Sequence, residues 1–422
     1  MQLKRALGFP SLTFYGVGII LGAGIYSVLG AAAGKAGDAL WISFTISSLV
    51  ALLTALSYAE LATTYPEASA EFTYLRKAFP RWPSAALVAG LLVALSGTAT
   101  TATVAIAFGG YLQDFAPIPP MLAAWTLIGA ALLVNVIGVK ESGWVNAVFT
   151  LLEAGGLVLF VIVGARAEGF GEALASAPNI GVASAAALVF FSFLGFENIA
   201  NLAEEAKDPA RDLPRAILVS LAVATTLYVL VALAAVALVT PDKLASSSAP
   251  LADAARAQSP RLAGALGGIA LFATANTALV SMLVSSRVLF GIARAGELPR
   301  SLAAVLPGRK TPWAATLVVA AVAAALAPVG KVELVGSVSS FASLLAFAGV
   351  NLALIVLRRS DAERERPFKV PGSVAGVPVL AALGLLATLA IATQLEARAL
   401  VGGSAAAAAF AAYAGWRHRR GR

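Results

Sequence analysis

Cysteine is absent from this chain of 422 residues, and histidine occurs once, as His418 near the C-terminus. Without cysteine the protein has no disulfide framework, no thiolate metal site and no disulfide-linked partner subunit. A single histidine in a basic tail also excludes a histidine-based zinc site or proton relay. We therefore expect no metal site and no cofactor.

Charged residues are scarce as well, at 12% of the chain, whereas an average soluble domain has about 25%. The mean hydropathy is +0.86, and 59% of the residues are hydrophobic. Apolar runs of about 20 residues without strict alternation indicate spanning helices rather than barrel strands. The sequence predicts an all-α integral membrane protein, with the lipid bilayer as a partner.

Twelve apolar segments are predicted to span the membrane, at residues 11–33, 39–63, 84–113, 121–138, 144–166, 181–205, 214–239, 263–293, 312–329, 333–358, 374–394 and 398–416. An even number places both termini on one side. With the termini inside, 23 of the 30 Lys and Arg residues fall on the inner side. This bias predicts cytoplasmic termini in a multi-pass protein of the cell (inner) membrane. The basic residues then reflect topology, so no nucleic acid partner is expected, and neither is a cleavable signal peptide.

Glycine interrupts the first apolar segment at Gly22-Ala23-Gly24. Each glycine weakens a helix by roughly 1 kcal/mol relative to alanine. A helix broken inside the membrane leaves free N–H groups, which bind anions, and open backbone survives there only if it lines a cavity or is covered by protein. The pattern predicts either a carboxylate site or a glycine motif for close helix packing.

A second interruption, Gly195 followed by Glu197, lies in the sixth segment. The two interruptions correspond if segments 1–5 and 6–10 are two halves, and five crossings per half make the repeat inverted. Paired interruptions of this kind indicate the binding site of a transporter. The predicted units are residues 11–166, residues 181–358 and a peripheral pair at 374–416.

Five fragments, in order along about 300 residues, resemble the amino acid–polyamine–organocation transporters. They are Gly22-Ala23-Gly24-Ile25-Tyr26, Ala59-Glu60-Leu61 with Tyr65-Pro66 and Glu71 to Leu75, Phe191 to Glu197 with Glu204 to Pro209, Leu213 to Ile217, and Arg294 to Pro299. The resemblance implies a LeuT-type fold, in which ten core helices form a five-plus-five inverted repeat, helices 1 and 6 are discontinuous, and two peripheral helices are added. Ser69-Ala70 and Ala295 depart from the family pattern.

The resemblance also implies where an amino acid substrate binds. Its carboxylate would meet backbone N–H groups of the first interruption, at Gly22, Ala23, Gly24 and Ile25. Its ammonium group would meet freed carbonyls, at Ile20, Phe191 and Leu194. Phe191 would also be an aromatic gate over the substrate.

Glu153 lies ten residues into the fifth segment. An intramembrane carboxylate is costly and is a functional hypothesis by default. Because burial favours the protonated carboxyl, Glu153 is a candidate for proton coupling. Two alternatives remain, namely a sodium site with hydroxyls such as Thr274 and Thr277, or a structural role in which Glu153 pairs with an arginine or faces a wet crevice.

Two further carboxylates call for interpretation. Glu197 is expected to cap the second half of the sixth helix, and it is also a possible gating or pocket charge. Glu60, near the inner end of the second segment, is expected to anchor a loop or an inner gate, with Arg76 or Arg215 as a partner.

The segments that line the pocket in this fold are uncharged here, at residues 96–103 and 339–343. This favours neutral amino acids as substrates, because a pocket for a cationic side chain would hold an acid. A proton-coupled symporter is the leading prediction, with an exchanger, a cationic amino acid or polyamine carrier and sodium coupling as alternatives. An enzyme is disfavoured because the sequence has no catalytic cluster, a channel because it has no filter repeat, and a receptor because it has no signalling domain. We expect a monomer or weak homo-oligomer.

Overall fold

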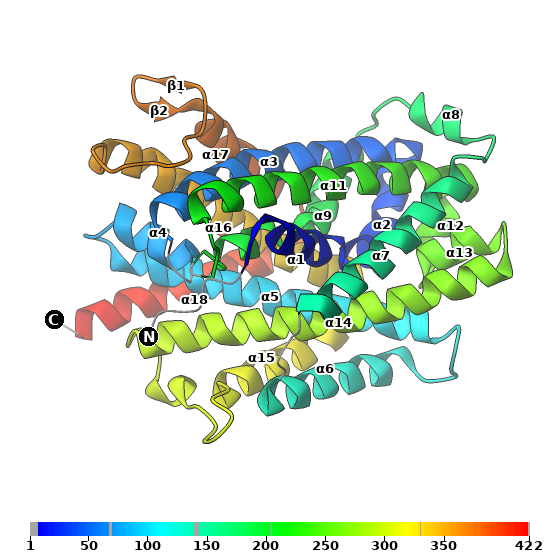
Figure 1. The fold of residues 1–422 in the computed structure, drawn as a ribbon. Helices are drawn as coiled ribbons and strands as arrows, with labels where there is room; N and C mark the ends of the chain where they lie inside the picture. Colours follow the sequence, from blue (N-terminus) through cyan, green and yellow to red (C-terminus); the bar gives the residue numbers. More distant parts are fainter. Residues whose placement is uncertain (1–6, 67–69, 139–142, 204, 330, 421–422) are drawn as a thin grey trace.

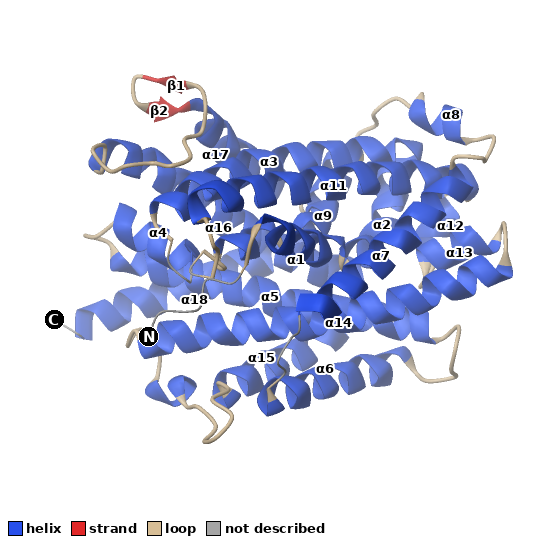
Figure 2. Cartoon of the chain, in the orientation of Figure 1, coloured by secondary structure: helices blue, strands red, loops and turns tan. Residues whose placement is uncertain are grey.

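The computed structural model of the protein describes residues 7–66, 70–138, 143–203, 205–329 and 331–420. Ser69 and Glu204, which belong to the motifs quoted above, lie outside these residues, as does the side chain of His418. The described chain is mostly helical (Figure 2).

The α-helices are α1 (Phe9–Leu21), α2 (Gly24–Ala36), α3 (Leu40–Thr64), α4 (Ala70–Ala78), α5 (Pro83–Leu112), α6 (Pro120–Ile137), α7 (Gly143–Gly164), α8 (Phe170–Leu174), α9 (Val182–Val189), α10 (Phe196–Ala200), α11 (Pro209–Leu238), α12 (Pro241–Ser246), α13 (Pro250–Arg256), α14 (Pro260–Arg294), α15 (Trp313–Leu326), α16 (Val332–Ser360), α17 (Val379–Ala392) and α18 (Ala397–Arg420). Short 3-10 helices are η1 (Gly37–Ala39), η2 (Phe190–Phe193), η3 (Arg300–Ala303) and η4 (Ala327–Val329). Strands β1 (Ser373–Val374) and β2 (Val377–Pro378) pair antiparallel.

The long helices form one bundle (Figure 1). Helix α5 packs against α14 and α16, helix α3 packs against α11, and α1 packs against α7 and α11. Helix α1 begins and α18 ends toward the same end of the bundle, on the left in Figure 1, where the β1–β2 hairpin also lies. The short helices α8, α12 and α13 lie at the opposite end.

Within the described residues, nine helical runs are long and apolar enough to cross a membrane. Three shorter apolar runs accompany them, at Phe9–Leu21, Trp313–Val329 and Val379–Ala392. The expectation of an all-α protein with many apolar helices is therefore confirmed.

Two predicted boundaries are wrong for identifiable reasons. The eleventh segment was expected to begin at residue 374, but β1 and β2 occupy its start and the helix begins at Val379. The seventh was expected to begin at Pro214, but α11 begins at Pro209, where the Asp208 side chain accepts a hydrogen bond from the Arg211 N–H at 3.3 Å. Proline suits the first position of a helix, so the earlier proline and its aspartate cap mark the true start.

Candidate functional site

The first interruption separates α1, which ends at Leu21, from α2, which begins at Gly24. Gly22 leaves the helical conformation with ψ −153°, and no side chain caps α2 at Ala23 from within its own segment. The cap comes from a distant helix, since the Thr277 hydroxyl of α14 accepts a hydrogen bond from the Ala23 N–H at 2.9 Å. The N–H groups in the first turn of a helix have no partner within that helix, and such a terminus can donate hydrogen bonds to an anion.

The second interruption follows η2. Leu194 is extended, and Gly195 has φ +129°, a conformation that suits only glycine. Helix α10 begins at Phe196, and the Glu197 carboxylate accepts a hydrogen bond from the Gly195 N–H at 2.8 Å. Glu197 therefore caps α10, as expected for a carboxylate in a first helical turn.

The two interruptions pack directly on each other. A Cβ atom added at Gly24 would lie 2.5 Å from the Ser192 Cα, and one added at Gly195 would lie 2.3 Å from the Ile19 Cγ2. Both distances are below van der Waals contact, so glycine is required at each position for this approach. The two breaks therefore lie in direct contact with each other.

A cavity opens at this meeting point. Residues of both interruptions line it together with side chains of α5, α14 and α16, among them Ile20, Ala23, Gly24, Ser96, Thr100, Phe191, Leu194, Glu197, Asn198, Asn276, Thr277 and Ser343. Of the sequence-predicted site residues, the cavity brings together Ile20, Ala23, Gly24, Phe191, Leu194, Glu197 and Thr277. Gly22, Ile25, Glu153 and Thr274 are not among the described lining residues.

Part of the cavity wall carries linked hydroxyls from α5 and α16. Ser96 on α5 is hydrogen-bonded to Ser339 at 3.0 Å and to Ser343 at 2.6 Å, both on α16, and Thr100 is bonded to Ser339 at 2.9 Å. Among the described lining residues, Glu197 has the only acidic or basic side chain. The part of the wall formed by Ser96, Thr100 and Ser343 is therefore polar and uncharged.

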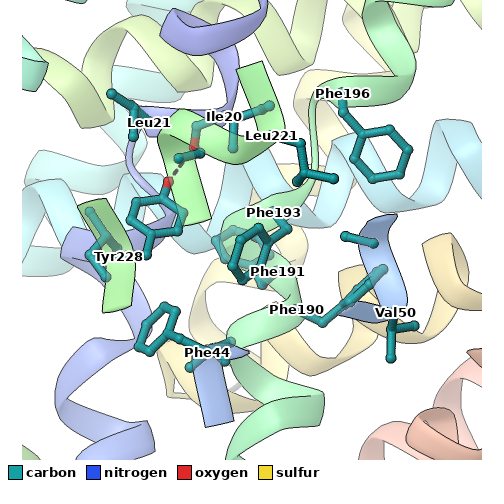
Figure 3. Close-up of a cluster of buried hydrophobic side chains, with 14 of the residues drawn as sticks. Ile20, Leu21, Phe44, Val50, Phe190, Phe191, Phe193, Phe196, Leu221 and Tyr228 are labelled. Carbon is teal, nitrogen blue, oxygen red and sulfur yellow. Dashed lines mark hydrogen bonds between the residues drawn. The ribbon is translucent and has the colours of Figure 1, made fainter. Parts of the chain in front are cut away.

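Tyr228 on α11 was not singled out from the sequence. Its hydroxyl donates a hydrogen bond to the Ile20 carbonyl, one of the carbonyls expected to meet the substrate ammonium (Figure 3). The Tyr228 ring packs against Phe44 and Phe193 at centroid distances of 5.8 and 5.4 Å. A buried tyrosine usually finds a hydrogen-bond partner for its hydroxyl. This requirement was the only indication in the sequence that Tyr228 would bind another part of the chain.

Glu153 on α7 is buried, with a relative exposure of 1%, and its Oε1 atom has no hydrogen-bond partner among the described residues. Tyr26 and Tyr228 lie within electrostatic range of the Glu153 carboxyl group. Within the described part of the chain, no ion pair joins Glu153 to an arginine. The expected alternative in which Glu153 pairs with an arginine therefore has no support. The two hydroxyls considered as its sodium-binding partners are engaged elsewhere, Thr274 with the Ala270 carbonyl at 2.7 Å and Thr277 with Ala23.

Charged side chains cluster at the bundle end where α1 begins. Glu60 is fully buried and pairs with Arg358 and, at 3.3 Å, with Arg366, while the Val370 N–H donates to it at 2.7 Å. The suggested partners Arg76 and Arg215 are therefore wrong. The expected anchoring role fits, because Glu60 ties the end of α3 to the end of α16 and its following loop.

A second buried carboxylate, Glu71 on α4, lies near this cluster. The Tyr58 hydroxyl donates to the Glu71 Oε1 at 2.8 Å. Burial raises the pKa of the Glu71 carboxyl, and the hydrogen bond from Tyr58 opposes that shift. Together with the Glu60 cluster, this pair joins α3, α4 and α16.

Comparison with known proteins gives a consistent result. The amino acid permease family matches residues 7–410. The branched-chain amino acid permease BcaP of Bacillus subtilis is 32% identical, covering 91% of this chain and 87% of the relative. The methylthioribose transporter of the same organism is 30% identical over 90% of this chain and 87% of its own length. The vacuolar cationic amino acid transporter 4 of Arabidopsis thaliana is 32% identical over 85% of this chain and 64% of its own length.

These matches confirm the resemblance seen in the five fragments. They extend it from separate motifs to nearly the whole chain, and the many apolar helices agree with it. The chain belongs to the amino acid permeases of the amino acid–polyamine–organocation superfamily, and it is a multi-pass membrane transporter rather than an enzyme.

Proposed function

We propose that this permease carries neutral L-amino acids by proton-coupled symport with alternating access. The observation that carries the proposal is the cavity at the two packed helix breaks. In this proposal the cavity offers N–H donors for the carboxylate of an amino acid and freed backbone carbonyls for its ammonium group.

In this proposal the substrate carboxylate binds the N-terminus of α2 at Ala23 and Gly24, with Gly22 and Ile25 shaping the turn. The ammonium group binds the carbonyls of Ile20, Phe191 and Leu194, and Phe191 is the gate. Tyr228 fixes the Ile20 carbonyl through its hydrogen bond. Glu197 caps α10 from the cavity and completes its polar lining.

The uncharged wall of Ser96, Thr100 and Ser343 supports a neutral side chain in the substrate. The relatives' names include both branched-chain and cationic amino acids, so they do not decide the class. A cationic side chain would need an acid in the wall, and Glu197, the one carboxylate among the described lining residues, already accepts from the Gly195 N–H at one of its two oxygens.

For coupling we propose that Glu153 binds and releases the transported proton. Its buried carboxyl oxygen without a hydrogen-bond partner supports a neutral, protonated form in part of the cycle. Tyr228 lies within electrostatic range of Glu153, and its hydroxyl donates a hydrogen bond to the Ile20 carbonyl at the end of α1.

The architecture that we propose is a LeuT-type fold with twelve crossings. Residues 11–166 and 181–358 form the two inverted halves, and residues 374–416 form the peripheral pair. Both termini are cytoplasmic in the cell membrane, and the protein works as a monomer or weak homo-oligomer. The direct packing of the two breaks supports the repeat, since equivalent elements of two halves meet at their interface.

Uptake of labelled neutral amino acids into liposomes containing the purified protein tests this function. We expect saturable uptake of L-alanine or L-leucine that an inward proton gradient increases and that sodium does not change. In competition, arginine and lysine should be weaker than alanine and leucine. Stronger competition by arginine or lysine would overturn the neutral class, and uptake that requires amino acid inside the liposomes would indicate exchange.

A further inference from the structure

We propose that Thr277 competes with the substrate carboxylate for the Ala23 N–H, an inference that rests on the carboxylate site proposed above. Thr277 lies on α14, 254 residues away from Ala23 in sequence, and its hydroxyl accepts from that N–H at 2.9 Å. The donor that the substrate needs is therefore bound by a side chain of the protein itself.

The position of the Thr277 oxygen is close to the broken backbone. A Cβ atom added at Gly22 would lie 2.4 Å from the Thr277 Oγ1, so the hydroxyl rests directly against this turn. Thr277 also lines the cavity together with Ala23 and Gly24. A carboxylate oxygen approaching the Ala23 N–H would occupy the space that this hydroxyl holds.

The competition has a consequence for the cycle. A symporter must pass through a substrate-free form, and in that form a buried N–H without an acceptor is unfavourable. Thr277 supplies the acceptor and joins the α1–α2 turn to α14. It thereby stabilises the substrate-free form, lowers substrate affinity and assists the return step of net transport.

The test compares Thr277→Val and Thr277→Ala, which remove the acceptor, with Thr277→Ser, which keeps it. Binding of L-alanine and L-leucine to the purified protein is measured by calorimetry, and net uptake and exchange are measured in liposomes. We expect binding about threefold to tenfold tighter without the hydroxyl, a slower net uptake and an unchanged exchange rate. Thr277→Ser should behave as the original protein.

Ser286→Ala is the matched control, because Ser286 is a buried hydroxyl of the same helix that bonds its own backbone, at the Leu283 carbonyl, and does not line the cavity among the described residues. Weaker binding in Thr277→Val and Thr277→Ala would overturn the inference by making Thr277 a direct ligand, and unchanged binding would also overturn it. If neither the original protein nor Thr277→Ser binds any amino acid, the proposed function fails instead.

Discussion

Replacing Glu153 by glutamine is expected to abolish uptake driven by a proton gradient while amino acid binding and exchange persist. Glutamine keeps the shape and polarity of the side chain but cannot bind and release a proton. Placing an ionised carboxylate inside a membrane costs about 2.5 kcal/mol or more. Glu153 is buried and has no ion pair among the described residues, so we expect it to be neutral in part of the cycle. Gradient-driven accumulation and counterflow in liposomes measure the two activities separately.

Glu168→Gln is the matched control, since Glu168 is an exposed carboxylate in the loop that follows α7. It should leave driven uptake unchanged. Driven uptake that survives in Glu153→Gln would remove the proton role. Uptake driven by sodium in the original protein and lost in this variant would assign Glu153 to a sodium site.

Gly24→Ala is expected to reduce uptake by about tenfold or more. The added methyl group would lie 2.5 Å from the Cα atom of Ser192, and backbone cannot move aside by changing a rotamer. Overpacking of this kind costs about 1–3 kcal/mol, and here it would separate the α2 terminus from η2. The test measures the initial rate of uptake and the substrate affinity of Gly24→Ala. The thermal stability of the variant is confirmed first.

The comparison variant is Gly268→Ala on α14, where an added Cβ meets nothing within 4 Å. Because alanine favours helix more than glycine does, this change should leave stability equal or slightly higher and uptake unchanged. Normal uptake and affinity in Gly24→Ala would show that the close approach of the two breaks is not needed for transport.

The positions of the two helix breaks were predictable because their cause is local. Glycines at residues 22, 24 and 195 interrupt two long apolar runs. In each run, one helix ends and the next begins beside these glycines. Most helix positions were predictable for the same reason, since about 20 apolar residues in sequence are enough to specify a spanning helix. The hairpin before α17 was missed because its four residues carry no strong strand pattern.

The side-chain partners of the site were not predictable, because they come from segments far apart in sequence. Thr277 was proposed as an ion ligand, and nothing in its local pattern indicates a bond to Ala23. Tyr228 is one aromatic residue in an apolar helix, and its bond to Ile20 depends on how α11 packs on α1. The partners suggested for Glu60, Arg76 and Arg215, were wrong for the same reason, since the observed partner Arg358 is 298 residues away and only the packing of α16 on α3 brings it close.

The central claim is that the substrate carboxylate binds at the N-terminus of α2, and a comparison of three ligands tests it most directly. The neutral amino acid with the strongest uptake, its amide and its N-acetyl derivative would each compete against the labelled amino acid for the purified protein. The amide lacks the carboxylate and the acetyl derivative lacks the ammonium group, so we predict that each binds at least about tenfold more weakly. Equal competition by the amide would contradict a carboxylate site at this helix break.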